Sequence, residues 1–205
     1  PFAEKCKMKV SRDGKSREVG KKAEFMCYEA WMEIQYKYKR ENNWRNYDLL
    51  EDLSTANEKA NLIIKSLEHH FIINGKSDYV RIHEGGDFYN GEYLNAWMLV
   101  SKKMPDVMFY AYTKSLPLLI KYKKILDSLP NFKLNISAGS SKPELEGIVG
   151  YPVASVYNKP EDVLKAGEII DLDDSIAYDK QNTNNFALLV HGMQTFEIEI
   201  GRAHV

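Results

Sequence analysis

The sequence has few cysteines, no long apolar run and almost no net charge. Its 205 residues include two cysteines, Cys6 and Cys27, too few for the disulfide framework of a small secreted protein. Apolar runs such as 186–190 are far shorter than the roughly 20 residues of a membrane-spanning helix, and no signal-peptide pattern opens the chain. The formal net charge is −1, which points neither to nucleic acid nor to an anionic membrane. We therefore expect a cytoplasmic protein without a membrane partner.

The proportions of apolar and charged residues are those of a globular protein. Apolar residues make up 44% of the chain and charged residues 28%, which is enough apolar surface for an ordinary buried core. The basic and aromatic stretch YKYKRENNWRNY, residues 36–47, is compatible with a nucleic-acid role, although a solvated helix end accounts for it better. The final segment IGRAHV resembles the translation of a common sequencing adapter, so we expect 200–205 to be an adapter-derived tail on a fragment of environmental origin.

Residue periodicity divides the chain into two regions. In the first region, 1–75, which carries both cysteines, apolar spacing predicts helices over 21–39 and 54–71, the second with Ser54 or Thr55 as N-cap. In the second region, 76–199, strands alternate with helices. The predicted strands are 79–83, 107–112, 132–137, 153–157 and 186–190, and the predicted helices are 90–103, 115–129 and 161–166.

This alternation is typical of βαβ units, and it predicts an α/β fold with a parallel sheet. We expect a partial (β/α) barrel, and a doubly wound open sheet is the alternative. In both architectures the functional groups gather at the carboxyl ends of the strands, so the residues that follow each predicted strand are the candidates. As catalytic residues we single out His83, Lys114 and His191, and as cofactor-binding residues Gly85, Gly86, Asp87, Ser137 and Ser140.

The loop after the first predicted strand, HEGGD, is the most informative of these strand ends. Gly85 and Gly86 allow the backbone to approach a ligand closely or to adopt positive φ. The Asp87 carboxylate could accept hydrogen bonds from a ligand ammonium, bind a hard metal ion, or cap the helix that begins near Asn90. His83 could serve as a base or ligand, or it could be a buried imidazole of the core.

The stretch RIHEGGDFYNGEYLNAWMLVSKKMPDVMFYAYTKS, residues 81–115, resembles a family of phage proteins named for gene product eighty-eight. Its glycine-glycine-acid step is also similar to an element of radical S-adenosylmethionine enzymes that holds the methionine amino group of the cofactor. The segments PFAEKC and CYEA resemble the cysteine pattern of the phage family, whose first cysteine would directly precede Pro1. The radical enzymes gather three cysteines in one C-x-x-x-C-x-x-C loop, whereas Cys6 and Cys27 are 21 positions apart.

The resemblance implies a radical S-adenosylmethionine-like iron–sulfur protein. A [4Fe–4S] cluster on Cys6 and Cys27 and the cofactor S-adenosylmethionine would then lie near Gly85, Gly86 and Asp87, with the substrate and the reaction left open. Two alternatives keep the same scaffold. The cysteines could hold a structural zinc ion in a binding module, or His83, Asp87 and His191 could bind the metal ion of a hydrolase or nuclease.

Overall fold

The structure, a computed structural model, describes residues 8–19 and 28–189. The predicted ligands Cys6 and Cys27, the candidate His191 and the tail 200–205 lie outside these residues. The N-terminal region contains β1 (Met8–Val10), β2 (Arg17–Val19), α1 (Tyr28–Gln35), α2 (Lys37–Glu51) and α3 (Ala56–Asn74). The remainder contains β3 (Tyr79–Arg81), α4 (Gly91–Lys103), β4 (Met108–Thr113), α5 (Leu116–Ser128), β5 (Phe132–Ser137), a 3-10 turn (Pro143–Leu145), α6 (Glu146–Val149), β6 (Val153–Tyr157), α7 (Pro160–Ala166), β7 (Ile169–Ile170), α8 (Ser175–Tyr178) and β8 (Phe186–Leu189).

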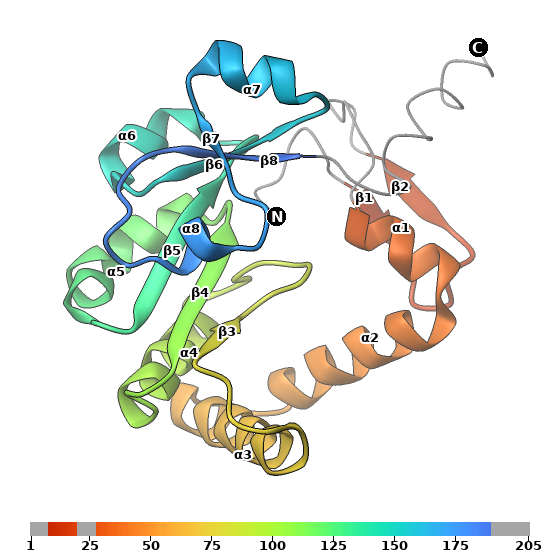
Figure 1. Ribbon diagram of the computed structural model, residues 1–205. Helices are drawn as coiled ribbons and strands as arrows, with labels where there is room; N and C mark the ends of the chain where they lie inside the picture. Colours follow the sequence, from red (N-terminus) through yellow and green to blue (C-terminus); the bar gives the residue numbers. More distant parts are fainter. Residues whose placement is uncertain (1–7, 20–27, 190–205) are drawn as a thin grey trace.

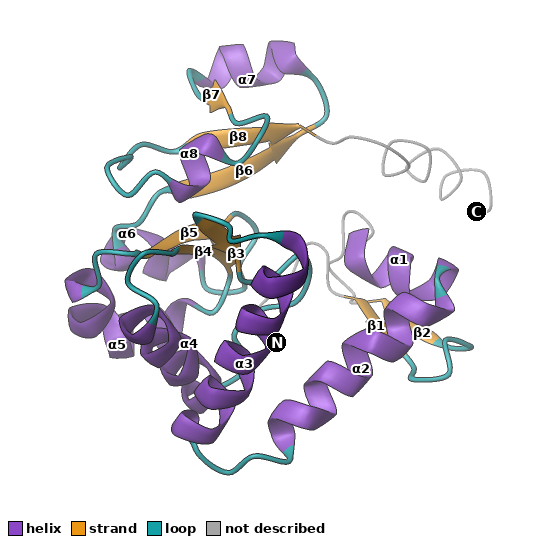
Figure 2. Cartoon of the chain, turned by 60° about the horizontal axis from the view of Figure 1, so that its bottom comes forward, coloured by secondary structure: helices purple, strands orange, loops and turns teal. Residues whose placement is uncertain are grey.

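Six parallel strands form the main sheet, in the order β3-β4-β5-β6-β8-β7. The first four strands are neighbours in sequence order, with no reversal at the centre of the sheet. A doubly wound sheet reverses its order in the middle, so the alternative topology is wrong and the predicted α/β partial barrel is confirmed as a curled half-barrel (Figures 1 and 2). Each predicted strand of the sheet is present, and the short strand β7 at the far edge is additional.

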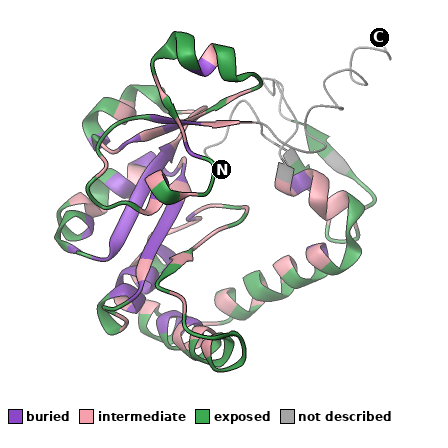
Figure 3. Ribbon diagram, viewed as in Figure 1, coloured by how far each residue is buried: buried purple, intermediate pink, exposed green. Residues whose placement is uncertain are grey.

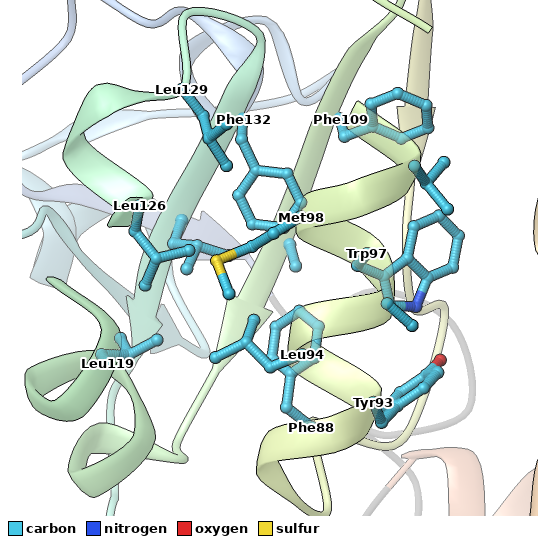
Figure 4. Close-up of a cluster of buried hydrophobic side chains, with 14 of the residues drawn as sticks. Phe88, Tyr93, Leu94, Trp97, Met98, Phe109, Leu119, Leu126, Leu129 and Phe132 are labelled. Carbon is cyan, nitrogen blue, oxygen red and sulfur yellow. The ribbon is translucent and has the colours of Figure 1, made fainter. Parts of the chain in front are cut away.

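The main core lies between the sheet and the helices α3, α4 and α5. Alternate residues of β4 and β5 face these helices, because successive side chains of a strand point to opposite faces. Figure 3 shows the purple, buried strands at the centre of this layer, and Figure 4 shows the side chains that fill it. Fully buried members include Phe88, Leu94, Phe109, Leu119 and Phe132.

The opposite, inner face of the half-barrel is polar and is covered by the segment that contains α8. Asp174 precedes α8 with a positive φ of 63°, and its carboxylate accepts hydrogen bonds from the Tyr110 hydroxyl at 2.8 Å and the Tyr112 hydroxyl at 2.6 Å. The Arg81 guanidinium donates to the same carboxylate at 3.2 Å and lies over the Tyr112 ring. Asn135 on β5 donates to the carbonyl of Ala177 at 2.8 Å. The chain therefore fills the middle of its own half-barrel.

The N-terminal helices differ from the prediction. Instead of one helix over 21–39, the structure has α1 and α2, separated at Tyr36, whose backbone is extended. The stretch 36–47 begins at Tyr36, the N-cap of α2, and forms the N-terminal part of this helix, which continues to Glu51. Within it Arg40 is buried and donates to the carbonyls of Arg12, Asp13 and Glu33, so this basic side chain holds the β1–β2 hairpin to the helices.

The second N-terminal helix follows the prediction closely. Thr55 caps α3, since its hydroxyl accepts from the Glu58 amide at 3.2 Å while the Glu58 carboxylate accepts from the Thr55 amide at 2.9 Å. Among the helices in 8–19 and 28–189, none combines the length and apolar character that a bilayer crossing requires.

Candidate functional site

The turn between β3 and α4 uses its two glycines for different physical reasons. Gly86 has a φ of +87°, a conformation that side-chain-bearing residues rarely adopt, and a Cβ atom added there would meet nothing within 4 Å. Gly85 has no such backbone requirement, but a Cβ atom there would lie 2.2 Å from Cγ of Glu29 in α1. Gly85 thus permits close contact with α1, and Gly86 leaves open space beside the backbone.

The Asp87 carboxylate joins this turn to the end of β4. It accepts hydrogen bonds from the Thr113 hydroxyl at 2.6 Å, the Lys114 amide at 2.7 Å and the Phe88 amide at 2.7 Å. Burial raises the pKa of Asp87 above its usual range, although these hydrogen bonds act in the opposite direction. Of the roles considered for Asp87, the helix cap is wrong, because Asn90 caps α4, accepting from the Tyr93 amide at 2.8 Å.

Three neighbouring strand ends meet beside Asp87. The Lys114 ammonium donates to the Ser137 hydroxyl at the end of β5, and the Ser140 hydroxyl donates to the Lys114 carbonyl at 3.3 Å. Gly139, between the two serines, has a φ of +84°. The structure therefore brings Asp87, Lys114, Ser137 and Ser140 together along the carboxyl edge of β3, β4 and β5. Their roles in catalysis or cofactor binding stay predictions.

His83 lies just after β3 and is surrounded by aromatic rings. Its Nε2 atom is 3.2 Å from the Tyr93 hydroxyl, and its ring centroid is 4.8 Å from that of Phe88. Burial, assisted by the charge of Arg81, lowers the pKa of His83 to about 4. The imidazole is therefore neutral at pH 7 and is a weak base, because a general base works best with a pKa near the operating pH.

Helices α1 and α2 close one side of the β3–α4 turn through an ion-pair network. Lys39 lies 2.9 Å from the Glu84 carboxylate and 3.3 Å from the Glu29 carboxylate. Burial opposes the charge on Lys39, but the hydrogen bond with Glu84 and the charge of Glu29 raise its pKa above the usual value. Asn43 also donates to Glu29, at 2.7 Å. Helices α1 and α2 are therefore attached to the carboxyl edge of the sheet through Glu29 and Lys39.

The model of the family described as Gene product 88 matches residues 1–201. The chain belongs to this family. The resemblance of residues 81–115 to the gene product 88 family is thereby confirmed. No curated protein and no solved structure matches the chain.

Metal binding in this gene product 88 member was predicted at residues that the structure describes only in part. Across 8–19 and 28–189, no three His, Cys, Asp or Glu side chains are grouped so that they could hold a metal ion. Two of the three ligands predicted for a hydrolase or nuclease are described, since His191 lies outside the described residues. The Asp87 carboxylate accepts hydrogen bonds from Thr113 and Lys114, and the His83 ring lies at hydrogen-bond distance from the Tyr93 hydroxyl. No contact of the described residues favours a metal-dependent hydrolase.

Sequence reasoning missed two sets of residues around the site. The first set, Tyr110 and Tyr112, could have been predicted from the segment FYAYT. The two-residue period of a strand places both tyrosines on the face opposite Phe109. Glu29 and Lys39 left no comparable signal. Their partners Gly85 and Glu84 are more than forty positions away, and only the tertiary fold brings the two regions into contact.

Proposed function

We propose that the chain is an iron–sulfur protein of the radical S-adenosylmethionine type. In this proposal Cys6 and Cys27 are cluster ligands, and the turn at Gly85 and Gly86 binds S-adenosylmethionine. The support comes from family membership, the half-barrel and the position of one helix. The substrate and the reaction remain open.

One contact carries the proposal: Glu29, in the first turn of α1, packs against Gly85. Cys27 is two residues before Glu29 in the sequence, and two residues span at most about 7 Å of extended chain. Glu29 in turn occupies the space that a side chain at Gly85 would need, since a Cβ atom there would be 2.2 Å from its Cγ. In this proposal the Cys27 thiolate lies near the glycine turn, as a cluster and its cofactor require.

The described side of the site offers groups that suit the cofactor. The open space beside Gly86 leaves its backbone accessible to a ligand. Asp87 uses its carboxylate for three internal hydrogen bonds, so in this proposal it acts as a positioning residue and main-chain carbonyls of the turn accept from the cofactor ammonium. Lys114 and Ser137 add an ammonium and a hydroxyl group at the adjacent strand ends.

The chain's own contribution is binding, orientation and exclusion of water. When bound, a cluster would supply one electron to S-adenosylmethionine for radical chemistry on a substrate. Lys39, paired with Glu29 and Glu84, holds α1 against the turn, and in this proposal that contact would keep the cluster ligand close to the cofactor. Phe88, fully buried directly after Asp87, seals the floor of the turn against water.

Anaerobic reconstitution tests the proposal. The complete reading frame that contains this chain, so that any cysteine before Pro1 is present, is incubated with iron and sulfide and assayed for both elements and for a visible absorption band bleached by reductant. We expect Cys27→Ser to lose the bound iron. A matched pair separates cluster from cofactor: Gly85→Ala should lower iron content by displacing Glu29, whereas Gly86→Ala should keep the iron and weaken S-adenosylmethionine binding.

The outcomes are distinct. Protein that binds neither iron nor sulfide, or that binds both equally well after Cys27→Ser, would contradict the proposal. Zinc bound without iron, and lost in Cys27→Ser, would instead establish the structural zinc module.

A further inference from the structure

A cavity lies away from the strand-end site, where the stagger of the sheet leaves part of β5 without a partner strand among the described residues. Only Ile136 and Ser137 of β5 pair with β6, so the first four residues of β5 have no partner strand on that side. A cavity of about 140 Å³ lies beside this unpaired edge. Its lining includes Phe132, Lys133, Tyr151, Lys180, Asn182 and Thr183.

Two lysines face this cavity, each with a single hydrogen bond to a main-chain carbonyl. Lys180 donates to the carbonyl of Phe132 at 2.6 Å, on the unpaired edge itself, and Lys133 donates to the carbonyl of Asn182. An ammonium has three N–H donors, so two remain on each lysine. Burial lowers the pKa of both lysines, and the charge of Lys180 lowers that of Lys133 further, so the two ammonium groups interact unfavourably.

The neighbouring acids offset this pair of charges only in part: the charge of Asp179 raises the pKa of Lys133 and that of Asp127 raises the pKa of Lys180, but burial outweighs both effects. Asp127 accepts a hydrogen bond from the Tyr151 hydroxyl at 2.7 Å and forms an ion pair with Lys123 at 3.2 Å. Asp179 accepts from the Gln181 amide at 2.8 Å. Within the described ranges, neither carboxylate comes within ion-pairing distance of the two cavity lysines. The cavity therefore holds an excess of positive charge in partly buried surroundings.

We propose that this cavity binds a phosphate group between Lys133 and Lys180. A phosphate carries about −1.5 to −2 charges at pH 7 as a monoester, which matches two ammonium groups. Its oxygens can accept the four N–H donors left free, and lysine is a common phosphate ligand. A cavity of 140 Å³ exceeds by several fold the 10–15 Å³ or so that one water occupies on a comparable measure, so a group of five heavy atoms fits. The inference is independent of the iron–sulfur proposal.

Calorimetric titration of the complete chain with inorganic phosphate tests the site. We expect binding that weakens at least about tenfold, or about 1.4 kcal/mol, in Lys133→Met and in Lys180→Met. Lys124→Met, which removes an exposed lysine of α5 from outside the cavity, is the matched control and should bind as the unaltered chain does. Glycerol phosphate and acetate are titrated in parallel at constant ionic strength.

Each outcome decides the proposal. Tighter binding of glycerol phosphate than of phosphate supports a phosphorylated small molecule as the ligand, and the reverse supports free phosphate. Absence of phosphate binding, equal loss in Lys124→Met, or equally tight binding of acetate overturns it. Should the lysine variants fail to fold, amide resonances of Asn182 and Thr183 in the unaltered chain must shift during the phosphate titration, and their failure to shift likewise overturns it.

Discussion

Replacing Asp87 should test whether its carboxylate holds the turn after β3 to the end of β4. Asp87→Ala leaves the Thr113 hydroxyl and the amides of Phe88 and Lys114 without their acceptor. A hydrogen bond to a charged group contributes about 1.5–3 kcal/mol, which for three bonds gives an upper sum of roughly 5–9 kcal/mol. Relief of the buried charge and entry of water offset part of this sum, so we expect the free energy of unfolding to fall by about 3–5 kcal/mol.

Urea unfolding followed by circular dichroism at pH 7 measures this loss. Asn90→Ala is the matched control, because it removes the true cap of α4 and should lower the free energy of unfolding by only about 1 kcal/mol. In a double-mutant cycle, Asp87→Asn and Thr113→Val should lose less together than the sum of the two single losses, because they remove the same hydrogen bond. A loss in Asp87→Ala no larger than that of Asn90→Ala, with additive effects in the cycle, would refute the reasoning.

Three further predictions concern other parts of the fold. The folded structure lowers the pKa of His83 to about 4, so protonation of this histidine favours the unfolded chain. The free energy of unfolding, measured with urea, should therefore fall by about 2 kcal/mol between pH 7.5 and pH 5. His83→Phe should abolish this pH dependence, whereas His69→Gln, which alters an exposed histidine, should leave it unchanged. Gly86→Ala should lower the thermal midpoint, because positive φ costs a side-chain-bearing residue about 1–2 kcal/mol, and an unchanged midpoint would contradict that conformation. Asp174→Asn should speed proteolytic cleavage within 171–183, since it removes the charge that binds Arg81 and two tyrosines, and cleavage at an unchanged rate would argue against that attachment.

The residues at the ends of the strands show which part of the candidate site could be predicted from the sequence. Parallel strands end at one edge, so knowing that 79–83, 107–112 and 132–137 are consecutive strands was enough to expect Asp87, Lys114 and Ser137 in one neighbourhood. The side-chain partners were not predictable in the same way. Asp87 looked equally suited to capping α4, and the choice between that cap and Thr113 depends on where β4 ends in space.

The sequence by itself determined the α/β class, the alternation of strands and helices and a helix start at Ser54 or Thr55, because these follow from local periodicity and from capping residues within a few positions. Only the tertiary structure decided the rest. The contact of Glu29 with Gly85, the attachment of Asp174 to the inner face and the cavity between Lys133 and Lys180 each join residues more than forty positions apart. Such contacts depend on the curl and stagger of the sheet, which arise from packing the whole chain and leave no periodic trace in any one segment.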